Sequence, residues 1–227
     1  EAEIGIEDLI QEEEMVVTIS HEGYIKRTAL STYKAQRRGG KGNRGMDARD
    51  DDFINQLFIA STHSYVFFFS DMGKVFVKKV YEIPQAARGA KGRAIVNFIG
   101  IEQGERIAAI TPVRDFEDGL YVTTLTRRGQ MKKTSVTEYR NFRASGIIGL
   151  KINEGDQLLT ACVTEGGTDL LVATRKGKSI RFGEDQVRPM GRAAQGVRAI
   201  DLDDDDVVVG MAATAPDRDQ VLAVCER

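Results

Sequence analysis

The feature that most constrains the fold is a unit that repeats along the chain. Four segments share the order of a β-rich run, a polar turn ending in glycine, and a second β-rich run. They are VVTISHEGYIKRTAL from residue 16, YVFFFSDMGKVFVKKV from 65, LYVTTLTRRGQMKKTSV from 120 and LLVATRKGKSIRFGE from 170. The turn glycines Gly23, Gly73, Gly129 and Gly177 are 50, 56 and 48 residues apart. A strand, a short turn with a glycine that can adopt positive φ, and a second strand predict one β-hairpin in each repeat.

Two further features recur after each hairpin. The first is a small or basic stretch, then a glycine, then alternating apolar residues: AQRRGGKGNRGM (35–46), AARGAKGRAIVNF (86–98), FRASGIIGLKI (142–152) and RAAQGVRAIDL (192–202). The second is a short apolar run: FINQLFIAS, RIAAITPV, QLLTACVTE and DVVVGMAAT. Each repeat therefore supplies about four short strands and little helix.

Such a unit cannot bury its apolar faces alone, whereas several units in a ring or stack can. The sequence therefore predicts an all-β, propeller-like domain over residues 1–227, with four-stranded blades. In this prediction four repeats are complete and a fifth begins near Gln220. The chain has no Trp, so the Trp-Asp signature of WD40 repeats is absent, and kelch signatures are absent too. Tyr65 and Phe67 to Phe69 alternate along a predicted strand and are expected in the core.

Composition narrows the class of protein. No run of about 18 apolar residues is present, so no transmembrane helix is expected. The first residues, EAEIGIEDLI, are acidic and do not resemble a secretory signal peptide. Cys162 and Cys225 have neither metal-site spacing nor a disulfide framework. These features favour a reducing cytoplasm and no membrane partner.

The formal net charge of −2 hides a segregation of charge. Residues 1–14 carry seven acids and no base, and residues 201–206 carry five acids and no base. The remaining residues hold 32 bases against 22 acids. This pattern is interpreted as a basic body with acidic appendages, because local fields decide which partners bind.

No catalytic constellation is recognisable. His21 and His63 are the only histidines, and neither belongs to a metal-ligand cluster. The aspartates at 203–206 lack the ligand spacing of a calcium loop, and a solvated turn is favoured. Nucleotide-binding glycine motifs and nucleophile motifs are missing. No catalytic site, metal or cofactor is therefore expected in this chain.

The basic residues recur in the turn, the second hairpin strand and the loop that follows. In a ring of blades, equivalent positions lie on one rim, and a positive rim binds phosphate backbones with little sequence preference. The predicted DNA-binding perimeter is Lys26, Arg27, Arg44, Lys78, Lys79, Arg88, Lys91, Arg93, Arg127, Arg128, Lys132, Lys133, Arg143, Arg175, Lys176, Lys178, Arg181 and Arg192. The alternative is that strand lysines such as Lys78, Lys79, Lys132 and Lys133 block edge-to-edge pairing.

The segment QRRGGKG combines three cations and three glycines without an apolar side chain. Glycines allow close approach of the backbone to an anion, and Arg and Lys donate charge-assisted hydrogen bonds to phosphate. The segment is therefore interpreted as a clamp for a phosphate backbone, with a linker that closes one blade onto another as the alternative. Its residues are Gln36, Arg37, Arg38, Gly39, Gly40, Lys41 and Gly42.

IEDLI near the start, VVTISHEGYIK, QRRGGKG and GVRAI in the fourth repeat closely resemble the C-terminal domain family of the bacterial DNA gyrase A protein. QRRGGKG matches the gyrase A box of that family at all seven positions. The resemblance covers essentially the whole chain and is most specific over residues 6–46.

The resemblance implies a β-pinwheel, usually of six blades, in which strands are exchanged between blades. It implies that duplex DNA wraps around a positive perimeter, and that the wrap imposes the positive crossover needed for negative supercoiling. The box would be required for wrapping. DNA cleavage and ATP hydrolysis would belong to the N-terminal part of the gyrase A protein and to the gyrase B protein. These partners would form a heterotetramer that uses ATP and Mg. The complex would be bacterial, cytoplasmic and nucleoid-associated. The chain departs from the family in being shorter than six blades require.

Two other functions remain open from the sequence. One is the DNA-bending C-terminal domain of topoisomerase IV, although that relative typically carries a degraded box. The other is a propeller that binds a protein partner, which predicts an exposed apolar patch and weak salt dependence.

Overall fold

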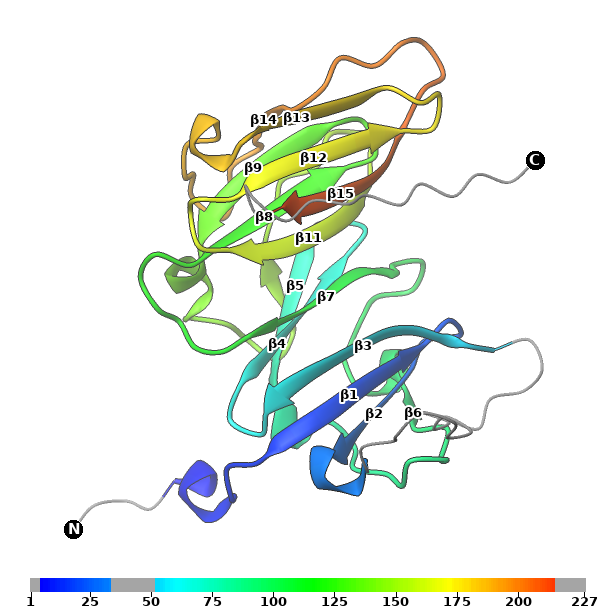
Figure 1. The fold of residues 1–227 in the computed structure, drawn as a ribbon, viewed down its shortest axis with the longest axis vertical. Helices are drawn as coiled ribbons and strands as arrows, with labels where there is room; N and C mark the ends of the chain where they lie inside the picture. The colour runs from blue at the N-terminus through cyan, green and yellow to red at the C-terminus, as the bar shows by residue number, and fades with distance from the viewer. Residues whose placement is uncertain (1–4, 34–51, 215–227) are drawn as a thin grey trace, which may run out of the picture.

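The computed structural model describes residues 5–33 and 52–214. In this part of the chain the fold is all β, with short 3-10 helices at strand ends, which confirms the predicted fold class (Figure 1). No helix among the described residues is long and apolar enough to cross a membrane. The gyrase A box, Arg44 and the expected start of a fifth repeat lie outside the described residues.

The four predicted hairpins are present. They are β1 (Glu14–Ser20) with β2 (Tyr24–Ala29), β4 (Tyr65–Ser70) with β5 (Lys74–Lys79), β8 (Tyr121–Thr126) with β9 (Gln130–Ser135), and β12 (Asp169–Thr174) with β13 (Ser179–Gly183). The four turn glycines have φ between 80° and 87°. This is the left-handed region that a side chain rarely adopts, so the repeated glycine has a direct backbone cause.

The apolar run that ends each repeat is an inner strand, antiparallel to the first strand of its own hairpin. The inner strands are β3 (Ile54–Ser61), β7 (Ile107–Val113), β11 (Leu158–Thr164) and β15 (Val208–Thr214). Strand β11 packs between β7 and β15, so successive sheets meet along these strands (Figure 1).

The fourth strand of a sheet comes from the next repeat. Short outer strands β6 (Arg93–Ala94), β10 (Ile147–Ile148) and β14 (Val197–Arg198) pair with β2, β5 and β9. The sheets therefore have the orders β3-β1-β2-β6, β10-β5-β4-β7, β11-β8-β9-β14 and, within the described residues, β13-β12-β15. This is the strand exchange that the family resemblance implies. We call residues 84–94, 140–148 and 188–198 the exchanged arms.

The core lies between sheets rather than within one. Phe68 on β4 packs in the cluster shared with the first sheet, whereas Phe67 and Phe69 pack in the cluster shared with the third sheet. Leu125 and Leu170 belong to a further cluster between the third and fourth sheets. Because successive side chains of a strand point to opposite faces, a central sheet of the stack buries both faces and reads as continuously apolar.

Four of the short 3-10 helices follow second hairpin strands, one follows the outer strand β6, and one precedes β1. They are η1 (Ile6–Leu9), η2 (Leu30–Thr32), η3 (Val80–Glu82), η4 (Ile95–Asn97), η5 (Val136–Tyr139) and η6 (Glu184–Gln186). Helices η3, η5 and η6 turn the chain out of a hairpin and into the arm that follows it. The exchanged arms and the hairpin turns, which carry most of the predicted perimeter residues, are thereby positioned by the sheets.

Candidate nucleic-acid interface

The first, third and fourth hairpin turns are each built from a hydroxyl, a glycine and a carboxylate from the loop that precedes the inner strand. In the fourth turn, the Thr174 hydroxyl accepts a hydrogen bond from the amide of Lys178 (3.1 Å), and the Asp206 carboxylate accepts one from the amide of Lys176 (3.0 Å). Asp52 and Asp156 bind the first and third turns in the same way. These buried acids, two residues before each inner strand, are structural residues that the sequence analysis missed.

The electrostatics of Asp206 show how firmly this turn is held. Burial alone would raise the pKa of its carboxyl. Hydrogen bonds from the Thr174 hydroxyl and from the amides of Lys176 and Val207 outweigh burial and lower the pKa below its usual value. The turn is thus fixed by a charged acceptor, and its basic side chains project from a defined backbone.

Lys26 does not lie on an exposed perimeter, and that part of the prediction is wrong. Its side chain is fully buried beneath the first exchanged arm. The ammonium donates to the carbonyl oxygens of Ala87 (3.1 Å), Ala90 (2.8 Å) and Arg88. These neutral carbonyl groups satisfy the charge, which allows a lysine to be buried.

Lys132 is the equivalent residue of the third sheet and is also fully buried. Its ammonium donates to the carbonyl oxygens of Gly149 (2.5 Å), Gly191 (3.4 Å) and Arg192. Burial, and then the nearby Arg192 charge, lower the pKa of Lys132 to about 8. Its predicted place on an exposed rim is also wrong.

Lys133 is the third lysine that the structure moves inside, with 4% of its surface exposed. It donates to the backbone carbonyl of Glu184 (3.0 Å), lies 3.8 Å from the Glu184 carboxylate, and sits over the Tyr121 ring. Neither an exposed DNA contact nor edge protection describes it. The prediction failed for all three lysines for the same reason. Each of them lies under an arm or loop that comes from a later repeat.

Several predicted perimeter cations have acidic partners within the chain. Lys78 pairs with Glu82 at 3.2 Å, Lys79 with Glu7 at 2.7 Å, and Lys91 with Glu22 at 2.9 Å. Arg181 pairs with Asp169, and Arg27 donates to the backbone oxygen of Ile83. These residues lie near the surface, but their charges are partly compensated.

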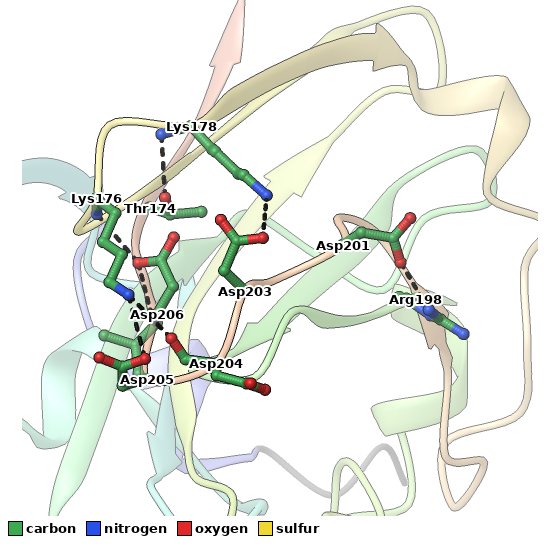
Figure 2. A network of polar contacts seen from close by, with 10 residues as sticks. Thr174, Lys176, Lys178, Arg198, Asp201, Asp203, Asp204, Asp205 and Asp206 are labelled. Atoms are coloured by element: carbon green, nitrogen blue, oxygen red, sulfur yellow. Dashed lines mark hydrogen bonds and ion pairs between the residues drawn. The ribbon is translucent and has the colours of Figure 1, made fainter.

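The fourth hairpin turn is the region in which most of the positive charges are paired with acids of the same chain. The acidic loop, residues 201–206, folds back over the basic turn (Figure 2). Lys178 pairs with Asp203 at 2.7 Å and Lys176 pairs with Asp205 at 3.2 Å. Arg175 donates to the Asp205 carbonyl, and Arg198 pairs with Asp201 at 2.6 Å. The acidic run is therefore no separate appendage, since it neutralises the cations beside it.

A different group of arginines remains available to bind an external anion. Among the described residues, the side chains of Arg93, Arg127, Arg128 and Arg143 are exposed and have no hydrogen-bond or ion-pair partner. Arg93 is on the outer strand of the first sheet, Arg143 is on the second exchanged arm, and the other two are in the third turn. Guanidinium groups without internal partners can donate bidentate hydrogen bonds to phosphate.

The remaining polar groups have structural surroundings. His21 stacks on Phe53, and the His63 ring bonds to the Ile10 carbonyl (2.8 Å). Burial raises the pKa of the Cys162 thiol to about 12, which keeps it protonated. No group of three His, Cys, Asp or Glu side chains suited to a metal occurs in residues 5–33 and 52–214.

The family model for the DNA gyrase C-terminal domain, a β-propeller, matches the chain four times, at residues 14–61, 64–114, 120–164 and 168–215. Curated relatives include the DNA gyrase A protein of Salmonella typhimurium, 47% identical over 92% of this chain, and that of Escherichia coli, 45% identical over 92%. The DNA gyrase A protein of Mycolicibacterium smegmatis is 38% identical over 96%. The chain spans about a quarter of the length of these relatives, 24% to 26%.

Solved structures show the same architecture. The C-terminal domain of DNA topoisomerase IV superposes with a TM-score of 0.76 at 28% identity, covering 91% of this chain and 62% of that one. A DNA gyrase A C-terminal domain superposes with a TM-score of 0.68 at 28% identity, covering 88% and 65%. The Escherichia coli ParC C-terminal domain, at 14% identity and a TM-score of 0.69, shares the fold.

Proposed function

The chain belongs to the DNA gyrase C-terminal domain family, and from this premise we propose that it binds duplex DNA and wraps it around its outer perimeter. The observation that carries the proposal is the set of exposed arginines without internal partners, Arg93, Arg127, Arg128 and Arg143. They are distributed over successive sheets, so a duplex that follows the arc of the stack meets one after another. The gyrase A box, residues 36–42, is proposed to fix where the wrap begins or ends.

The physical requirement is a large set of weak contacts. Bending about 20–30 base pairs through 40–90° costs roughly 1–6 kcal/mol by smooth elastic estimates. Each neutralised phosphate releases counterions and contributes about 0.9 to the salt slope, log K against log salt concentration. A row of arginines can therefore offset the bending cost, and binding should weaken steeply as salt rises.

The wider role follows the family. We propose that the wrap gives DNA a positive crossover, which the assembled enzyme converts into negative supercoils with ATP and Mg. In this proposal the catalytic sites belong to the N-terminal part of the gyrase A protein and to the gyrase B protein, and the heterotetramer works on the bacterial chromosome in the cytoplasm. The C-terminal domain of topoisomerase IV shares the fold, whereas the curated relatives at 38% to 47% identity are gyrase proteins.

Linking number tests this function. The chain is incubated with relaxed circular DNA at low and at moderate salt, a nicking-closing enzyme is added, and the linking number is read after protein removal. A shift of one sign that declines with salt supports wrapping. Binding without a shift leaves simple bending, as in the topoisomerase IV alternative, and an absence of binding refutes the proposal.

The box is tested with a matched triple variant. Arg37→Ala with Arg38→Ala and Lys41→Ala is expected to reduce the linking-number shift more than Arg127→Ala with Arg128→Ala and Arg143→Ala. Both variants remove three cations, so a simple loss of charge predicts equal effects. Equal losses would remove the special role given to the box.

A protein-binding surface is the second candidate. Leu57 and Ile59 on β3 are each 51% exposed, next to exposed Phe53. Such residues suit an apolar partner, and association through them would depend weakly on salt. Absence of DNA binding even at low salt would favour this surface over a phosphate-binding perimeter.

A further inference from the structure

The exchanged arms use one position of the scaffold in two chemically different ways. Each arm pairs with two residues of a second hairpin strand, and the next residue of that strand lies beneath the arm. That residue is Lys26 in the first sheet, Phe76 in the second and Lys132 in the third. Since the three positions are equivalent, Phe76 shows that an apolar side chain can fill the site.

The arm over Lys26 is shaped around its ammonium. An ammonium has three N–H donors, and the carbonyls of Ala87, Arg88 and Ala90 provide three acceptors. These residues lie within four positions of one another, so their carbonyls must converge toward the interior. The arm then returns to the sheet, where Ile25 pairs with Arg93.

The arm over Lys132 repeats this arrangement and adds a link. Lys132 binds the carbonyls of Gly191 and Arg192 from the third arm and that of Gly149, which follows the second arm. The amide of Lys151 also donates to the Ala194 carbonyl (3.3 Å). Neighbouring arms are therefore joined at the perimeter, with one ammonium at the junction.

The arm over Phe76 needs no such donor. The Gly146 amide donates to the Arg143 carbonyl (2.9 Å), which closes a local turn. A β-carbon placed on Gly146 would lie 2.9 Å from the Phe76 ring, so the arm packs directly on the aromatic face. Filling the core and closing an arm are thus possible without a charge, and the two lysines do something more than fill space.

Glycines at the arm ends make the close approach possible. A β-carbon on Gly92 would lie 2.6 Å from the Ile25 carbonyl oxygen and 3.1 Å from the Lys26 β-carbon. Gly196 meets Met131 and Lys132 in the same way. Gly92 and Gly196 have φ of 89° and 92°, so any side chain there also strains the backbone.

We propose that Lys26 and Lys132 are positioning residues for DNA binding, which hold the first and third arms in the shape that presents their cations to phosphate. The proposal rests on the proposed function and adds buried residues that touch no DNA. The first arm carries Arg88, Lys91 and Arg93. The third carries Arg188 and Arg198, which are exposed, and Arg192, whose Nη1 atom is buried. The mechanism is indirect: inward carbonyl groups bind the ammonium, and the arm's basic side chains are thereby fixed on the outside.

The test combines hydrogen exchange with the salt dependence of binding to a mixed-sequence DNA duplex. Lys26→Met keeps the length of the side chain and removes its donors. Amide exchange is expected to accelerate at residues 87–92 and to stay unchanged in the β4–β5 hairpin. The slope of log K against log salt is expected to fall by about two, because the arm's cations lose their fixed positions and each phosphate contact contributes about 0.9.

Phe76→Met is the matched control, since it places the same side chain at the equivalent position. It is expected to leave the salt slope and exchange at 87–92 unchanged. Gly92→Ala gives a second test that alters no charge: the added β-carbon pushes the arm off the strand. Gly104→Ala is its control, because Gly104 also has φ of 89° but open space around a β-carbon.

Unchanged exchange at residues 87–92 in Lys26→Met overturns the proposal. A fall in slope of about one or less in both Lys26→Met and Gly92→Ala also overturns it, because that is no more than the loss of a single contact. If Lys26→Met does not fold, the Gly92→Ala and Gly104→Ala pair decides. Failure of the unaltered chain to bind DNA refutes the proposed function, whereas exchange at 87–92 separately decides whether Lys26 holds the arm.

Discussion

The lysines beneath the exchanged arms and the cations of the fourth hairpin turn come from the same basic pattern, but the fold uses them in opposite ways. Lys26 and Lys132 are buried and bound by neutral carbonyls. Lys176 and Lys178 are at the surface and bound by the carboxylates of Asp205 and Asp203 (Figure 2). The first pair is held by backbone groups under the exchanged arms, whereas the second forms ion pairs at the surface.

The difference teaches that the group to which a cation is bound decides whether the cation contributes to protein stability or to DNA binding. An ammonium inside the protein must be fully hydrogen-bonded, so its removal leaves several carbonyls without a donor. An ion pair in water contributes little to stability because solvent already satisfies both groups. We therefore expect the buried lysines to matter for stability as well as for the shape of the arms, and the surface turn to matter for DNA affinity alone.

The largest expected effect is that of Lys132→Met on stability. The methionine removes the lysine donor from the carbonyls of Gly149 and Arg192, whereas the Gly191 carbonyl keeps the amide of Ala194 (3.0 Å). An unsatisfied buried polar group costs about 1–3 kcal/mol. Some carbonyls will turn to water, so we expect a loss of about 3 kcal/mol in the free energy of unfolding. Urea denaturation measures it.

Lys176→Met sharpens the same comparison, because it removes a surface cation and is expected to change the unfolding free energy by no more than about 0.5 kcal/mol. Equal losses for Lys132→Met and Lys176→Met would mean that burial of the ammonium has no structural consequence. A stabilised Lys132→Met variant would mean that desolvation of the charge exceeds the value of its hydrogen bonds.

The second effect is a dependence on pH that only the buried lysine should show. The pKa of Lys132 is about 8 in the folded chain against 10.5 when exposed, through burial and then Arg192, with Glu138 acting in the opposite direction. Between these values the unfolded state binds the extra proton, so stability rises with pH. From about pH 8 to about pH 9.5 the gain is about 1.5 kcal/mol, since one pKa unit corresponds to about 1.4 kcal/mol.

The quantity to measure is the difference between the unaltered chain and Lys132→Met at each pH. Burial raises the pKa of the Cys162 thiol and of the Tyr139 hydroxyl, and both groups oppose the trend at high pH. Their contributions are common to both proteins and cancel in the difference. A difference that stays constant over this pH range would show that Lys132 keeps its ordinary pKa.

Much of the fold was predictable because its causes are local. Alternation of apolar side chains fixes the strands, and a glycine with positive φ fixes each hairpin turn, so Gly23, Gly73, Gly129 and Gly177 mark the repeats correctly. The continuous apolar run of β4 also indicates burial on both faces. The destination of β6, β10 and β14 was not predictable from these signals, because pairing with an earlier sheet is a non-local choice; it entered only through the family resemblance.

The site was predicted less well for the same reason. A lysine on a hairpin strand looks exposed until a later repeat supplies the carbonyls that cover it. A signal was nevertheless present, since Lys26 and Lys132 both stand three residues after a turn glycine and are matched by the glycine-ended arms RGAKG and RAAQG. Similarly, Asp206 and its equivalents precede the inner strands at a constant spacing, although the DLDDDD run was interpreted as an acidic appendage.

The smallest expected effect belongs to the acidic loop, and it acts on DNA affinity rather than on folding. Asp203→Asn with Asp205→Asn releases Lys178 and Lys176 while keeping Asp206, which binds the turn backbone. Two additional cations available to phosphate should steepen the salt slope by about two and raise affinity at low salt several-fold.

Glu117→Gln with Asp118→Asn is the control, because it removes the same charge from acids with no basic partner among the described residues. A general reduction in negative charge would raise affinity equally in both variants. A steeper salt slope in the Asp203→Asn, Asp205→Asn variant alone would show that these acids keep the cations of the fourth turn from binding DNA. Equal salt slopes in the two variants would place this turn away from the path of the DNA.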